Sequence, residues 1–276
     1  MIKKFFRLLF FLAIAQAVFG QSAGLRITVQ INNGELTILS SQGSVRELVI
    51  PAEINGMPVT AIGENAFTRR GLVRVVIPDS VTVIGEQAFS YNQLTSLVIG
   101  NNVVSIGQKA FYSNKLRTLT LGEAVSEIGM GAFAGNSLEE IAIPQSVTRI
   151  NAYAFFMNRL RALELPGGVS FVGEGAFSAN QLHTLVMTAG IEEIGDGAFY
   201  NNQLTSITVP ETIRELGKRV FESRTTLRGS EPPVDFVDER GEILFTTANN
   251  FDTFYAANGR RAGKYVFSRG SWGFEE

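Results

Sequence analysis

Residues 81–89 read Val-Thr-Val-Ile-Gly-Glu-Gln-Ala-Phe and residues 103–111 read Val-Val-Ser-Ile-Gly-Gln-Lys-Ala-Phe, so one pattern recurs after 22 residues. Alanine precedes the aromatic residue in seven of eight successive turns, and Val220 does so in the eighth. The aromatic series itself is unbroken: Phe67, Phe89, Phe111, Phe133, Phe155, Phe177, Phe199 and Phe221. A fixed period of this length is typical of a solenoid, in which each repeat buries its apolar side against its neighbours.

Each repeat carries an alternating apolar segment before this motif. Leu97 and Ile99, for example, alternate with outward positions at period two, which is typical of a half-buried strand. Pro78 or Gly100 then predicts a turn, and a short extended return leads to the Ala-Phe loop. We therefore predict a mainly β chain of about eight 22-residue coils, stacked at roughly 4.8 Å into a rod about 40 Å long.

Two further positions of the repeat carry small or polar residues. We call the set of residues at one such position, taken over all coils, a column. Glycine, or asparagine in one coil, follows the last apolar residue of the return: Gly63, Gly85, Gly107, Gly129, Asn151, Gly173, Gly195 and Gly217. Because these two residue types best tolerate a positive φ, we expect a left-handed turn at this column.

Asparagine forms a second column: Asn92, Asn114, Asn136, Asn158, Asn180 and Asn202. A stacked asparagine inside a solenoid can satisfy backbone groups of its own coil and of the adjacent one, so we interpret this column as a structural ladder and not as a ligand site.

The two ends of the chain depart from the repeat. Residues 1–20 combine a basic head with an apolar run and small residues, the pattern of a secretory signal peptide; the run is short for a membrane span. Residues 24–47 contain two strand-like segments around Asn32-Asn33-Gly34 and predict a capping hairpin. The solenoid would then occupy residues 48–227.

Residues 228–249 contain Pro232-Pro233 and an acidic stretch, and we predict a linker there. Residues 250–276 predict a small α+β tail, with a short helix from Asn250 to Asn258 and a hairpin pairing residues 264–267 with residues 271–272. Arg260, Arg261 and Lys264 make this tail basic, which fits a capping piece against an acidic rod or a binding site.

Composition excludes several classes of function. Loss of the three basic residues of the signal peptide changes the formal charge from −2 to −5, which argues against nucleic acid as an electrostatic partner. The chain has no cysteine and one histidine, His183, so nucleophilic triads and His-based metal sites lack their parts. Glu192, Glu193 and Asp196 read as a solvated charge run. We predict no catalytic residue, no metal and no cofactor.

The outward positions of the strands are the most informative surface. Most are serine, threonine or valine, but the third to fifth regular coils carry Arg117, Glu139, Glu140, Arg161 and Glu164. Arg117, Glu139 and Arg161 alternate in sign at strand spacing and can support one another while staying accessible. We interpret these five residues as a charged patch on a protein-binding face. β-propensity alone, without any ligand, explains the same sequence.

These coils resemble a known family. Leu138-Glu-Glu-Ile-Ala-Ile-Pro-Gln-Ser-Val-Thr-Arg-Ile150 and Ile84-Gly-Glu-Gln-Ala-Phe89 are similar to the BspA-like, treponemal-type leucine-rich repeat, over about residues 25 to 227. The resemblance implies a right-handed leucine-rich-repeat solenoid. It also implies an exported or surface protein of a host-associated bacterium. Some members of the family bind matrix or host proteins. Family membership names no partner.

Two classes of function follow. An exported protein-interaction module, in one version a surface adhesin for host matrix or bacterial envelope proteins, agrees with the extended face and the missing catalytic set. A structural, envelope-associated repeat protein without a dedicated ligand agrees with everything except the charged patch. A carbohydrate binder is third, because the chain has a single tryptophan and no aromatic residue at the outward strand positions. The oligomeric state and the compartment outside the cytoplasm stay open.

Overall fold

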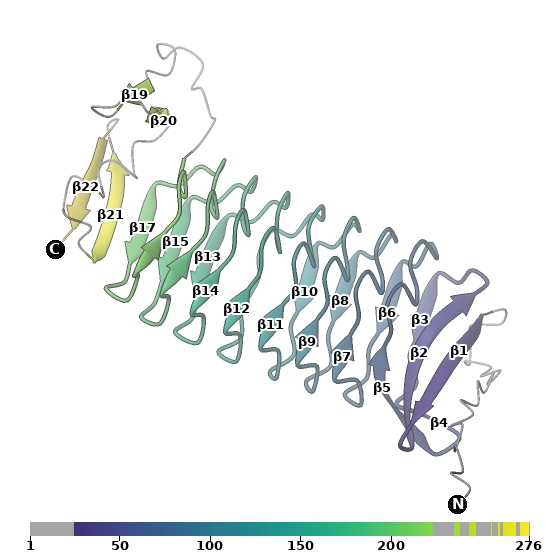
Figure 1. Ribbon diagram of the computed structural model, residues 1–276. Helices are drawn as coiled ribbons and strands as arrows, with labels where there is room; N and C mark the ends of the chain where they lie inside the picture. Colours follow the sequence, from purple (N-terminus) through teal and green to yellow (C-terminus); the bar gives the residue numbers. More distant parts are fainter. Residues whose placement is uncertain are drawn as a thin grey trace, which may run out of the picture.

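The computed structural model describes residues 25–222, the strands at 235–237 and 243–246, Tyr255, Gly259, and residues 262–268 and 271–275. The predicted signal peptide lies outside these residues. The described chain forms a rod of stacked coils with a hairpin at each end (Figure 1). Each coil contributes a short strand to one sheet, and most coils contribute another to the opposite side.

One sheet of eleven strands runs along the rod, and its pairs beyond the first hairpin are parallel except for β4 against β5. Its strands are β1 (Arg26–Asn32), β2 (Glu35–Gln42), β4 (Glu53–Ile54), β5 (Met57–Ile62), β7 (Val83–Ile84), β9 (Ser105–Ile106), β11 (Glu127–Ile128), β12 (Arg149–Ile150), β14 (Phe171–Val172), β16 (Glu193–Ile194) and β18 (Glu215–Leu216). These are the short extended returns that the sequence predicts, and we call their outer surface the return face.

The opposite side, which we call the strand face, is built from two separate sheets. The first contains β3 (Glu47–Val49), β6 (Arg74–Val76), β8 (Ser96–Val98) and β10 (Thr118–Thr120). The second contains β13 (Ala162–Leu165), β15 (Thr184–Met187), β17 (Ser206–Val209), β21 (Gly263–Ser268) and β22 (Ser271–Glu275). Every parallel pair joins residues 22 apart, such as Leu97 and Leu119, once the repeat is regular.

The core is a stack of phenylalanine rings. The eight rings of the series are at most 2% exposed, and neighbouring ring centroids lie 5.2 to 5.7 Å apart in parallel planes. The alanine before each ring is buried as well, which leaves room for the aromatic residue of the next coil. Full burial of one such side chain is worth roughly 1.5 to 3 kcal/mol, so the column is a main source of stability.

The asparagine ladder lies beside this stack. Asn136 donates from Nδ2 to the carbonyls of Phe133 in its own coil and Phe111 in the preceding coil, at 2.9 and 3.0 Å. Its Oδ1 accepts a bond of 3.0 Å from the backbone N–H of Leu116. The other five asparagines repeat these three bonds, so each side chain satisfies backbone groups of two coils.

The prediction of a left-handed turn at the glycine column is wrong. None of its seven glycines has a positive φ. The left-handed residues lie instead two positions before and two positions after the phenylalanine, for example Gln87 at 52° and Tyr91 at 56°. The glycines are required by close approach: a Cβ on Gly107 would lie 2.6 Å from the carbonyl carbon of Gly85 in the preceding coil. The absence of a side chain, and not the sign of φ, explains this column.

The N-terminal cap is a hairpin, as expected. β1 pairs antiparallel with β2 across Asn33 and Gly34, which have φ values of 51° and 84°, and β2 then pairs in parallel with β5 of the first coil. Both central residues therefore have the positive φ that a tight hairpin turn requires. This hairpin extends the eleven-stranded sheet beyond the first coil, with β1 as the end strand.

The C-terminal tail caps the opposite end of the rod. β21 pairs antiparallel with β17, and β22 pairs with β21, which confirms the predicted hairpin. Tyr265 is fully buried beneath it. The predicted helix from Asn250 to Asn258 lies, except for Tyr255, outside the described residues. Part of the predicted linker forms an antiparallel pair, β19 (Asp235–Val237) with β20 (Ile243–Thr246), because aromatic and β-branched residues there favour strands.

Candidate functional site

The strand face presents alternate side chains of each strand to solvent. In Thr118–Thr120 the two threonines are exposed while Leu119 lies in the core, and Ser96–Val98 repeats this pattern one coil earlier. Because the strands pair in register, equivalent outward residues form straight rows along the rod. The face is therefore a flat surface whose rows are read directly from the repeat.

The five residues of the charged patch are all exposed on this face. Glu139 and Arg161 form an ion pair of 3.4 Å, with side chains 52% and 67% exposed. Arg117, one coil away, makes no ion pair among the described residues. An exposed pair of this kind stabilises a fold by only about 0.2 to 1 kcal/mol, so these charges contribute little to stability and remain available to a partner.

The strand face is interrupted where the patch lies. Residues 140–143 belong to no strand, although every other regular coil has one here, and the two sheets end at β10 and β13 on either side. The N–H of Arg161 still donates to the carbonyl of Glu139 at 3.2 Å, so the coils stay linked. Residues 140–143 read Glu-Ile-Ala-Ile, close to the Ala-Leu-Glu-Leu that forms β13, so strand propensity does not explain the gap. The sequence-based expectation of a strand in every coil is wrong at this one.

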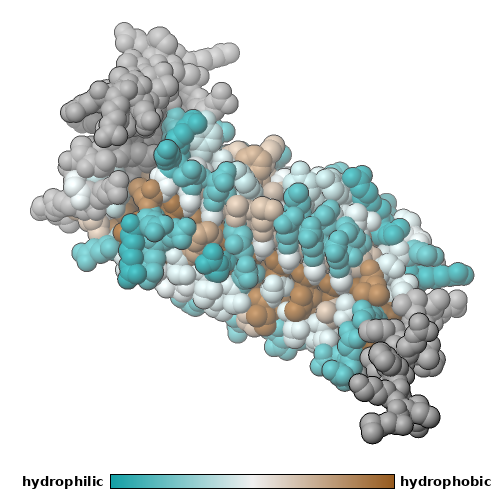
Figure 2. Space-filling view, viewed as in Figure 1, coloured by the Kyte–Doolittle hydropathy of each residue, from teal (hydrophilic) through white to brown (hydrophobic). Residues whose placement is uncertain are grey.

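In the first coils of the strand face, one row of outward residues is apolar. Val49, Val76 and Val98 pair in register and are 59%, 42% and 63% exposed. The strand face therefore changes along the rod from an apolar stripe to the charged patch. Figure 2 shows that hydrophobic surface also runs as a band along the rod in the view drawn there, between hydrophilic side chains.

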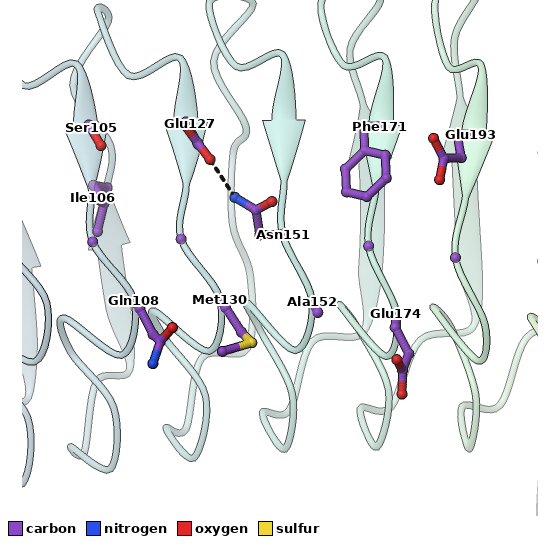
Figure 3. Close-up of a pocket in the computed structure, with 14 residues that line it drawn as sticks. Ser105, Ile106, Gln108, Glu127, Met130, Asn151, Ala152, Phe171, Glu174 and Glu193 are labelled. Atoms are coloured by element: carbon purple, nitrogen blue, oxygen red, sulfur yellow. Dashed lines mark hydrogen bonds between the residues drawn. The ribbon is translucent and has the colours of Figure 1, made fainter.

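The return face contains a groove of about 650 Å³ that the sequence analysis did not identify. Its floor follows the glycine column through Gly107, Gly129, Gly173 and Gly195. Figure 3 shows Ser105, Glu127, Phe171 and Glu193 along one side and Gln108, Met130, Ala152 and Glu174 along the other. A column without side chains between two columns that have them forms a trough. The glycine column, interrupted here only by Asn151, was the signal for it in the sequence.

Polar groups in this groove are partly engaged with one another. Asn151 donates from Nδ2 to Oε1 of Glu127 at 2.7 Å, and the guanidinium carbon of Arg149 lies 4.0 Å from the ring centre of Phe171. The remaining carboxylates along the groove are Glu174 and Glu193.

A smaller hollow of about 400 Å³ lies next to the groove, where Gly175 and Gly197 separate Tyr153 from Tyr200. The Tyr153 hydroxyl donates to Glu174, and this hydrogen bond raises the pKa of Tyr153 above its ordinary value. Arg219 stacks 4.9 Å from the ring centre of Tyr200. Several side chains of this hollow therefore contact one another.

The residues considered for chemistry are placed as follows. His183 is exposed and lies directly before β15. Glu192 pairs with Arg214 at 3.4 Å, and Asp196 accepts a bond of 2.8 Å from the backbone N–H of Lys218. Across residues 25–222 and the described parts of the tail, no group of three metal-binding side chains comes together. The same part of the chain contains no helix long and apolar enough to cross a membrane.

The family profile for the BspA-type leucine-rich repeat region matches the chain in six copies, over residues 40–161, 105–228 and 150–270. The protein therefore belongs to the BspA-type leucine-rich repeat family. The members of this family are repeat proteins, and the coils described above are the repeats that the profile matches.

Solved structures of bacterial repeat proteins are similar to the chain. The leucine-rich repeat protein of Treponema pallidum is 23% identical, with a TM-score of 0.47, over 73% of this chain and 90% of that one. A leucine-rich cell surface protein of Faecalibacterium prausnitzii is 21% identical, with a TM-score of 0.44, over 71% and 72%. The pneumococcal vaccine antigen PcpA is 19% identical, with a TM-score of 0.40, over 76% and 47%. A search of curated proteins found no match.

Proposed function

We propose that the protein is an exported interaction module whose strand face binds a host matrix protein or a bacterial envelope protein. The carrying observation is the charged patch: five exposed ionic residues lie on a flat face, and the ion pair among them stays more than half exposed. The chain belongs to a family of repeat proteins and has an extended surface, which supports a binding function.

The position of the patch adds to this proposal. It lies where the two strand-face sheets end, so its coil has fewer ladder hydrogen bonds than its neighbours and presents its side chains from an irregular backbone. Binding residues are often carried by irregular segments on a rigid scaffold. The apolar stripe of Val49, Val76 and Val98 provides a second, uncharged contact area on the same face.

The test compares two ion pairs that differ in location alone. Glu139→Ser with Arg161→Ser removes the pair on the strand face, and Glu192→Ser with Arg214→Ser removes a pair of the same 3.4 Å length on the return face. Binding of the mature protein to immobilised matrix proteins and envelope fractions would be measured by surface plasmon resonance. We expect the first variant to lose at least tenfold in affinity and the second to retain it.

Two further variants separate the alternatives. Arg117→Ser and Glu164→Ser, added to the first variant, should abolish binding, while Arg260→Ser, Arg261→Ser and Lys264→Ser in the tail should not. Retained binding of the patch variant together with loss in the tail variant would make the rod a spacer and the tail the recognition site. If neither variant changes anything because no partner is bound, the structural, envelope-associated function replaces this proposal.

A further inference from the structure

The groove on the return face has the dimensions of a site for one extended chain. It spans five coils from Ser105 to Glu193, which is about 19 Å at the usual strand spacing. Its volume of about 650 Å³ is spread over five coils in a straight row, a shape that suits an extended segment lying along the rod. The floor of the groove carries one side chain, that of Asn151, which is held against Glu127 and the carbonyl of Ile128.

The charge of the groove favours a basic ligand. Three carboxylates line it, those of Glu127, Glu174 and Glu193, and no lysine, arginine or histidine is among its lining residues. With the adjacent Arg149 included, the formal charge is −3 + 1 = −2. Between the carboxylates lie Phe171, Ala152 and Met130, the last 39% exposed. The groove therefore has a net negative charge, and Glu127 and Glu193 lie on either side of the Phe171 ring, on which Arg149 stacks.

The spacing of these groups matches an extended peptide. Glu127 and Glu193 occupy the same position of the repeat, three coils apart, or about 14 Å. In an extended strand, residues i and i+4 are separated by about the same distance and point to the same side, with i+2 between them.

From this geometry we infer that the groove binds an extended segment of a partner polypeptide with lysine or arginine at positions i and i+4 and an apolar residue at i+2. The basic side chains pair with Glu127 and Glu193, and the apolar residue lies against Phe171 and Ala152. This site is on the return face and does not depend on the strand-face function proposed above.

The test uses the fluorescent peptide Gly-Ser-Lys-Thr-Phe-Thr-Lys-Ser-Gly and a second peptide with glutamate in place of both lysines. Fluorescence anisotropy with the full mature chain should show binding of the lysine peptide and none of the glutamate peptide. The affinity should fall with added salt, because exposed ion pairs are screened. Glu127→Gln with Glu193→Gln should weaken binding about three- to tenfold, as expected for the loss of two exposed ion pairs.

A matched variant controls for net charge. Glu123→Gln with Glu211→Gln removes two exposed carboxylates from turns outside both proposed sites and should leave peptide affinity unchanged. Ala152→Trp fills the groove without changing charge and should reduce binding as much as the groove double variant does, with an unchanged unfolding midpoint. Equal losses in the two charge variants, equal binding of both peptides, or no binding of the lysine peptide at millimolar concentration would each overturn the inference.

Discussion

The asparagine ladder and the glycine column each repeat one type of residue in most coils, yet they join the coils in opposite ways. Asn136 acts through its side chain, whose amide makes three hydrogen bonds to two coils. Gly129 acts by having no side chain, since a Cβ there would lie 2.5 Å from the carbonyl oxygen of Ile106. A uniform column can therefore mark a group that is required or a space that must stay empty.

The single exception in the glycine column shows how strict that space is. Asn151 has a Cβ, and its backbone N–H lies 3.0 Å from the carbonyl of Ile128, whereas the glycines make the equivalent bond at 2.7 to 2.8 Å. Its side chain donates to Glu127 and to Ile128, which compensates part of the longer contact. The glycine column thus tolerates a side chain where the coils separate slightly and the new polar group finds partners.

The largest expected effect is at the ring between the two columns. Phe133→Ala should lower the free energy of unfolding by about 3 to 5 kcal/mol, because the rings on either side, 5.4 Å away, hold the cavity open. Equilibrium denaturation in urea measures this change. A loss below about 1 kcal/mol would mean that the two columns, and not the ring stack, hold the coils together.

A smaller effect is expected in the ladder. Asn136→Ala leaves the carbonyls of Phe111 and Phe133 and the N–H of Leu116 without this partner, so we expect a loss of about 1 to 3 kcal/mol. The same denaturation experiment provides the number. Asn136→Asp keeps the shape of the side chain but replaces the amide donor, and it should be at least as destabilising. If neither variant changes the free energy of unfolding, the asparagine ladder does not join the coils.

The smallest effect is expected in the glycine column. Gly129→Ala should cost about 1 to 2 kcal/mol, at the low end for overpacking, because the coils can separate as they do at Asn151. The control is Asn151→Gly, which removes a side chain from the same column. If the column required flexibility at positive φ, Asn151→Gly would stabilise the protein; with close packing as the cause, it should lose the bonds to Glu127 and Ile128 and gain nothing from φ.

Much of the interaction surface is visible in the sequence, and one part is not. The outward positions of the strand face follow from period-two alternation, so the exposure of Arg117, Glu139 and Arg161 could be predicted. The groove could not be predicted, because it is formed by three neighbouring columns of residues over five coils. A glycine at a repeated position can equally reflect a turn or close packing. The sequence also predicted a strand in the coil of Glu140, where the two sheets of the strand face end.

The sequence alone determined the period, the buried ring and alanine, the ladder, and the hairpins at both ends, because each depends on local alternation, turn residues or repetition. Only the tertiary structure decided which residues have positive φ, why Gly107 cannot carry a side chain, where the strand face breaks, and that the return face is hollow. The physical reason is the same in each case. These features depend on the distance to a coil 22 residues away, and no local pattern encodes that distance.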